Sequence, residues 1–151
     1  MLLDKICEED IDIGIEADDW EDAIKKSSLY LLEKKKINQS YIDAMIDAVK
    51  RVGPYIVLGN HVALAHARPE CGVNELSLHF TTLTPPIPFG SEKFDPIKLI
   101  ITLAATNADS HLELMASLAE VLMEEENVNI LVASKTPKEF IKKLNKMRNE
   151  E

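Results

Sequence analysis

The sequence of 151 residues lacks several features that would each mark a class of protein. No apolar run approaches the ~18 residues that a membrane-spanning helix needs, which argues against a membrane span. The segment Met1–Asp10 has four acidic residues and no apolar core, so it does not resemble a secretory signal peptide. Lys and Arg number only 17 against 26 Asp and Glu, and the net charge of −9 argues against binding to nucleic acid.

Cysteine is scarce as well. Cys7 and Cys71 are far apart, and neither belongs to a closely spaced pair of the kind that binds zinc. We therefore expect free thiols in the reducing environment of the cytoplasm, and neither a metal ion nor a cofactor. The G-x-S-x-G motif and a glycine-rich phosphate loop are also missing, which disfavours a hydrolase.

The remaining composition fits a single globular domain that covers residues 1–151. Hydrophobic residues make up 46% of the chain and charged residues 28%, as is typical of such domains. Stretches with helical spacing of apolar residues alternate with short apolar stretches typical of strands. Helices are expected at 18–36, 40–51, 107–122 and 136–147, strands at 10–15, 55–58, 62–65, 74–83 and 97–105, and either element at 128–133. This alternation predicts an α/β fold with a mixed central sheet and helices on both sides.

Two stretches in the middle of the chain carry more specific expectations. Asn74–Leu83 alternates apolar and polar residues, which predicts a strand with one buried face and one solvated face. His79 belongs to the polar face, so we expect it to be an ordinary surface histidine. Four prolines and one glycine then predict a long loop over Thr84–Pro96, and loops of this length often serve a function.

The stretch Gly59–Gly72 places a histidine where a strand meets a loop. The short buried strand runs into His66 and cannot continue past Arg68-Pro69, because proline does not donate to a sheet and holds the residue before it extended. One side of the ring would then pack against the protein and the other would be open to solvent, which suits a nucleophile or a proton carrier. His61 lies five residues earlier and would face the other side of a regular strand.

A second informative stretch runs from Asn107 to Glu113. Ser110 and Glu113 match the S-x-x-E capping box, which predicts a helix that begins there. His111 would lie in the first turn, where free backbone amides and the positive end of the helix dipole favour an anion.

Together these stretches resemble the enzyme IIA proteins of the sugar phosphotransferase system, in the mannitol/fructose class. Members carry a strand that ends in Pro-His-Gly or Pro-His-Ala, and here the tripeptide is Ala65-His66-Ala67, with alanine in the place of proline. The continuation Ala67-Arg68-Pro69-Glu70 is most similar to the ascorbate-type subgroup. An asparagine that precedes a second histidine in the family is matched by Asn107 and His111.

The resemblance implies a cytoplasmic phosphotransferase that carries a phosphoryl group on the outer nitrogen of His66. His111 would assist, and Ala67, Asn107 and Ser110 would bind the group. The donor would be the histidine-containing phosphocarrier protein and the acceptor an enzyme IIB, which serves a membrane enzyme IIC for uptake of an ascorbate- or pentitol-like sugar. These partners would dock around the His66 pocket, with the loop near Phe89 at its rim. A homodimer is left open.

Three alternatives remain at this point. His61, His66, Cys71 and His111 could form a metal site, although their spacing is not that of common zinc motifs. A hydrolase is the least favoured. A regulatory domain of the same fold, which signals nutrient state by binding a protein, is not separated from a transport component by the sequence. The family's arginine near the end of the second helix is not assigned, because Ala48 fills its place and Lys50 and Arg51 lie nearby.

Overall fold

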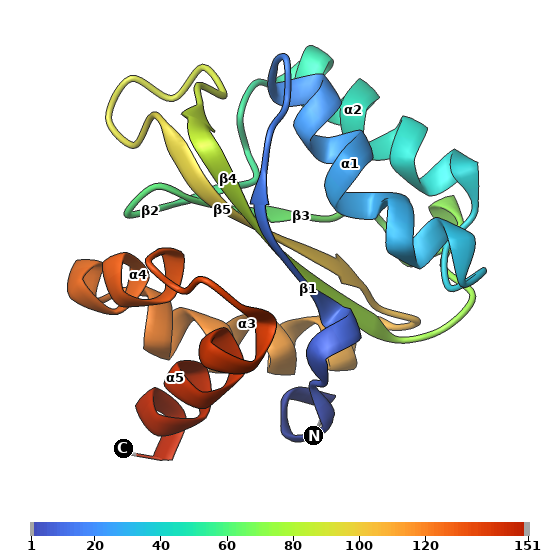
Figure 1. Ribbon diagram of the computed structural model, residues 1–151. Coiled ribbons are helices and arrows are strands. Elements are labelled where there is room, and N and C mark those ends of the chain that lie inside the picture. The colour runs from blue at the N-terminus through green and yellow to red at the C-terminus, as the bar shows by residue number, and fades with distance from the viewer. Residues whose placement is uncertain (1, 150–151) are drawn as a thin grey trace.

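A mixed five-stranded sheet runs through the computed structural model, which describes residues 2–149 (Figure 1). The strand order is β1-β4-β5-β3-β2. Pairs β1/β4 and β3/β5 are parallel, whereas β4/β5 and β2/β3 are antiparallel. The strands are β1 (Ile11–Ile15), β2 (Val57–Gly59), β3 (Val62–Ala65), β4 (Ser77–Ile87) and β5 (Ile97–Ala104).

Helices cover both faces of this sheet. In Figure 1, α1 and α2 lie together on one face, and α3, α4 and α5 lie on the other. The helices are α1 (Trp20–Glu33), α2 (Gln39–Val52), α3 (Ala108–Leu122), α4 (Glu125–Val132) and α5 (Pro137–Asn149), with short 3₁₀ turns at Leu2–Lys5, Glu8–Asp10 and Pro69–Cys71. The predicted fold class is therefore confirmed, and residues 128–133 are mostly helical. Within residues 2–149, no helix is both long and apolar enough to cross a membrane.

The sheet separates two apolar cores, because successive side chains of a strand point to opposite faces. In β3, Ala63 and Ala65 pack toward α1 and α2, while Val62 and Leu64 pack toward α3–α5. All four side chains are fully buried. A strand buried on both faces cannot shift its register without exposing apolar surface, so the position at which β3 ends is strongly specified.

Strand β4 differs from the sequence-based expectation. It is buried on both faces from Ser77 to Leu83, and His79 is 0% exposed, so the prediction of a surface histidine was wrong. Helix α1 covers the polar face of β4. Asp12 of β1 supplies a carboxylate whose Oδ2 lies 2.8 Å from Nε2 of His79.

The loop after β4 is also shorter than predicted. Strand β4 continues to Ile87, which pairs with Ile97, so the loop covers only 88–96. Pro85 and Pro86 are accommodated because they fall where the pairing with β5 is irregular, between Thr82 and Ile87.

Tyr41 of α2 joins three parts of the fold through one buried hydroxyl group. It accepts a hydrogen bond from the backbone N–H of Ala67 at 3.0 Å and donates one to the carbonyl of Leu103 at 2.7 Å. Burial raises the pKa of Tyr41 to about 12, so the hydroxyl keeps its proton. The segment after β3 is thereby tied to both α2 and β5.

We expect Tyr41→Phe to lower the free energy of unfolding by about 1–3 kcal/mol, because a buried amide and a buried carbonyl lose their partner. Urea denaturation followed by circular dichroism measures this. Tyr30→Phe is the matched control, since the Tyr30 hydroxyl bonds to Glu9 at an exposed position. Its cost should stay near about 0.5 kcal/mol, as for other surface substitutions. Equal losses in the two variants would contradict the role given to Tyr41.

Candidate functional site

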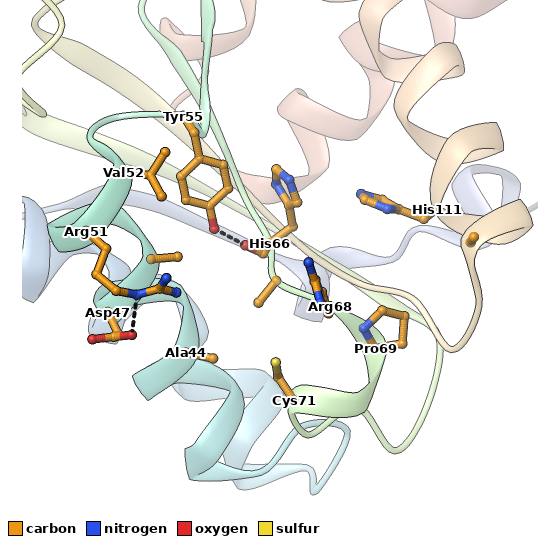
Figure 2. Close-up of a pocket in the computed structure, with 13 residues that line it drawn as sticks. Ala44, Asp47, Arg51, Val52, Tyr55, His66, Arg68, Pro69, Cys71 and His111 are labelled. Carbon is orange, nitrogen blue, oxygen red and sulfur yellow. Dashed lines mark hydrogen bonds and ion pairs between the residues drawn. The ribbon is translucent and has the colours of Figure 1, made fainter.

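An open groove of about 870 Å³ lies at the carboxyl ends of β3 and β5 (Figure 2). These strands are parallel neighbours, so the segments that follow them emerge at the same edge of the sheet, where α/β folds commonly bind ligands. Helix α2 forms the opposite wall. The lining residues are Ala44, Asp47, Ala48, Arg51, Val52, Tyr55, His66, Ala67, Arg68, Pro69, Cys71, Ala108 and His111.

His66 is the first residue after β3, and its ring has a fixed orientation. Nδ1 lies 2.6 Å from the carbonyl oxygen of Leu64. Because a carbonyl oxygen only accepts hydrogen bonds, Nδ1 carries the proton and Nε2 of the neutral ring keeps a free lone pair. Burial lowers the pKa of His66, the bond to Leu64 opposes that shift, and nearby His111 adds to it.

The backbone at His66 is held by a second tyrosine as well as by Tyr41. The Tyr55 hydroxyl donates a 2.6 Å hydrogen bond to the carbonyl of His66. The two rings meet edge to face, with their centroids 5.4 Å apart. Tyr55 therefore fixes both the backbone and one side of the imidazole. The sequence assigned Tyr55 to a strand, but β2 begins two residues later and leaves Tyr55 in the preceding turn.

His111 of α3 lies beside His66, as predicted. The ring centroids are 5.1 Å apart and the ring planes are inclined by 51°. Nε2 of His111 is buried and has no hydrogen-bond partner among the described residues. Burial lowers the pKa of His111 too. Two imidazoles that favour their neutral forms can both act as acceptors or donors of hydrogen bonds near pH 7.

The start of α3 differs from the predicted capping box. The N-cap is Asn107, whose Oδ1 accepts a 2.9 Å hydrogen bond from the N–H of Ser110, so Ser110 lies inside the helix and does not cap it. Asparagine is as good an N-cap as serine, and the earlier start places His111 at the fourth helical position. Its N–H already bonds to the carbonyl of Asn107, which leaves the amides of Ala108 and Asp109 as unpaired donors at this helix end.

The predicted binding residues divide into two groups. Ala67 lines the groove, whereas Asn107 and Ser110 lie next to it, at the N-terminal end of α3. Arg51, Arg68 and Asp47 also line the groove, although no role was predicted for them from the sequence. In the sequence, Pro69 was the one indication that Arg68 lies near the site, because proline holds the residue before it extended and Arg68 directly follows the histidine segment.

Gly72 closes the loop that follows this segment. Its φ of 137° is unfavourable for other residues, and a Cβ there would lie 2.5 Å from Oγ of Ser40 and 3.1 Å from the amide nitrogen of Tyr41. The loop therefore packs directly on the first turn of α2, near the tyrosine that holds Ala67.

Two residues considered from the sequence lie far from the groove. His61 is in the turn before β3, at the opposite end of that strand from His66, with Nδ1 2.9 Å from the carbonyl of Pro96. The four side chains of the alternative metal site are thus not brought together, and no group of three metal-ligating side chains occurs between residues 2 and 149. Phe89 is buried against Trp20 beyond the other end of β4, so its predicted place at the rim was wrong.

Comparison with known proteins gives the family. The profile described as "Phosphoenolpyruvate-dependent sugar phosphotransferase system, EIIA 2" matches residues 5–147. The mannitol-specific cryptic phosphotransferase enzyme IIA component of Escherichia coli (strain K12) is 38% identical over 139 residues, which cover 92% of this chain and 94% of that protein. The ascorbate-specific PTS system EIIA component of Shigella boydii is 34% identical over 142 residues, covering 93% and 92%.

Solved structures agree with these sequence relatives. The solution structure of the mannitol-specific cryptic enzyme IIA of Escherichia coli has a TM-score of 0.85 at 36% identity and covers 97% of this chain and 99% of that one. A complex of the mannitol enzyme IIA with phosphorylated enzyme IIB from Escherichia coli matches with a TM-score of 0.81 at 26% identity, covering 93% and 97%. The chain therefore belongs to the EIIA 2 family of the phosphoenolpyruvate-dependent sugar phosphotransferase system, whose EIIA components are phosphotransferases that work through a phosphohistidine.

Proposed function

We propose that this protein accepts a phosphoryl group on Nε2 of His66 from the histidine-containing phosphocarrier protein and passes it to an enzyme IIB. The observation that carries the proposal is the hydrogen bond from Nδ1 of His66 to the carbonyl of Leu64. It holds the ring in one tautomer, and the nitrogen left with a lone pair belongs to a ring that lines an open groove. A neutral imidazole in that state is a good nucleophile.

The transfer needs little from the protein beyond positioning. The Nε2–P bond forms as the donor's N–P bond breaks, and the electron pair of the broken bond stays on the donor nitrogen. His66 keeps its Nδ1 proton, so the phosphorylated ring carries positive charge that the Leu64 carbonyl stabilises. His111, whose ring lies beside that of His66, and the unpaired amides at the start of α3 would donate hydrogen bonds to the phosphoryl oxygens.

The partners would dock on the surface around the groove. Apolar side chains there are unusually open to solvent: Val52 is 69% exposed and Leu112, next to His111, is 64% exposed. Such residues favour a small, transient protein interface. The mannitol and ascorbate relatives suggest a polyol or an ascorbate-like sugar acid as the substrate of the whole system, delivered through a membrane enzyme IIC. We place the protein in the cytoplasm, with residues 1–151 forming one EIIA domain.

Incubation with phosphoenolpyruvate, the general phosphotransferase enzymes and this protein tests the acceptor assignment. Mass spectrometry should show the gain of one acid-labile phosphoryl group. The gain should vanish in His66→Ala and persist in His61→Ala, since His61 lies at the other end of β3. A label that survives in His66→Ala would sink the assignment.

The second histidine should assist without carrying the group. We expect His111→Ala to accept phosphate about 10–100-fold more slowly, because one hydrogen bond to the phosphoryl oxygens is lost. Rapid-quench measurement of the first turnover gives the rate. Leu112→Ala is the control, because it alters the neighbouring exposed side chain but keeps the imidazole. Its rate shows how much of any loss comes from weaker docking of the phosphoryl donor. If His111→Ala matched the parent rate, His111 would have no part in the site.

His66 should lose its ability to accept a phosphoryl group only at acidic pH. Burial lowers the pKa of His66 below the usual value of about 6.5, so the ring is neutral at pH 7 and gains a proton on Nε2 only as the pH falls through the lowered pKa. The rate of phosphorylation by phosphoramidate should therefore stay flat from about pH 8 to 6.5 and fall below that. An NMR titration of the His66 ring should have its midpoint below 6.5. A midpoint at or above that value would contradict the buried, neutral ring.

A further inference from the structure

Two arginines line the groove, and only one of them is paired with a carboxylate. Arg51 of α2 is paired with Asp47 one turn earlier, with Nε 2.9 Å from Oδ2. The guanidinium of Arg68 makes no hydrogen bond or ion pair with any residue in the described part of the chain. Arg68 is therefore the lining cation whose hydrogen-bonding capacity is unused.

Arg68 lines the same groove as His66, two residues further along the chain. Arg68 has an extended conformation, with φ −68° and ψ 144°, and Pro69 reinforces it. Both His66 and Arg68 line the groove, and the Cα atoms of residues two apart on an extended chain are separated by about 7 Å at most. In Figure 2, Arg68 is drawn beside Pro69, below the gap between the two histidine rings. An arginine side chain can span that distance to a group on Nε2.

A phosphoryl group in this groove would meet few positive charges other than that of Arg68. It brings about two negative charges at neutral pH. The two histidines favour their neutral forms, and Arg51 is already bound to Asp47. A guanidinium fork matches the oxygens of a phosphoryl group and binds them with charge-assisted hydrogen bonds.

We propose that Arg68 binds the phosphoryl group carried by His66 and holds it until a partner takes it. This inference rests on the function proposed above. The alternative for an exposed, unpaired arginine is a contact with an acidic surface of a protein partner. The two roles differ in one respect: only direct contact changes the properties of the phosphoryl group when no partner is present.

The test uses phosphoramidate, which phosphorylates histidine without a protein partner. The parent, Arg68→Gln, Arg68→Lys and Arg51→Gln are phosphorylated, and the ³¹P resonance is followed against pH. A nearby positive charge favours the dianionic phosphoryl group, so its pKa should rise by about half a unit or more in Arg68→Gln. Arg68→Lys should give a smaller rise, and Arg51→Gln, the matched control, should remain close to the parent.

Transfer from the phosphocarrier protein gives an independent measure. The equilibrium constant for phosphorylation should fall about tenfold in Arg68→Gln, which corresponds to one lost charge-assisted hydrogen bond. An unchanged ³¹P titration in Arg68→Gln overturns the proposal, and if only transfer between proteins is slowed, Arg68 contacts the partner instead. If only Arg51→Gln changed the ³¹P titration, Arg51 of α2 and not Arg68 would bind the phosphoryl group, and the proposal would be overturned. If the parent takes no phosphoryl group on His66, the proposed function fails before Arg68 is tested.

Discussion

Parallel pairing between β3 and β5 is the constraint on which the site depends. In this pair, Ala65 lies opposite Thr102, so the chain leaves both strands at the same edge of the sheet. The exit from β3 delivers His66 and the exit from β5 delivers the start of α3, which carries His111. Residues 45 positions apart in sequence are therefore held with their rings 5.1 Å apart. A shift of either strand would bury or withdraw one ring, and the burial of β3 on both faces opposes such a shift.

Rigidity at this edge comes from hydroxyl groups and carbonyls more than from the histidines themselves. Tyr41 and Tyr55 fix the backbone on either side of the His66 peptide, and the Leu64 carbonyl fixes its ring. Among the described residues, these contacts leave Nε2 as the ring nitrogen of His66 that has no hydrogen-bond partner. The chemistry is thus confined to one atom whose surroundings are already set before a partner arrives, which is the general condition for efficient group transfer.

The sequence predicted what depends on local pattern and missed what depends on packing. Periodicity and proline gave the strands, the helices and the exposed end at His66. The alternation of apolar and polar residues in β4 distinguished its two faces, but it could not show that α1 covers the polar face. His79 was therefore predicted at the surface, whereas it is buried. At α3, serine and asparagine are both good caps, and only the backbone geometry selects Asn107. The roles of Tyr41 and Tyr55 depend on contacts between distant segments, for which a single sequence carries no signal.

The width of the groove has a consequence for the lifetime of any group stored in it. Ala44 and Ala48 leave the α2 wall low, and about 870 Å³ is far more space than three phosphoryl oxygens fill. The surplus admits a side chain of another protein, but it admits water equally well. Protection against hydrolysis therefore cannot come from a closed lid, as it does in enzymes that seal their sites. The phosphorylated fraction of such a carrier would then depend on how quickly the donor delivers the phosphoryl group and how quickly the acceptor and water remove it.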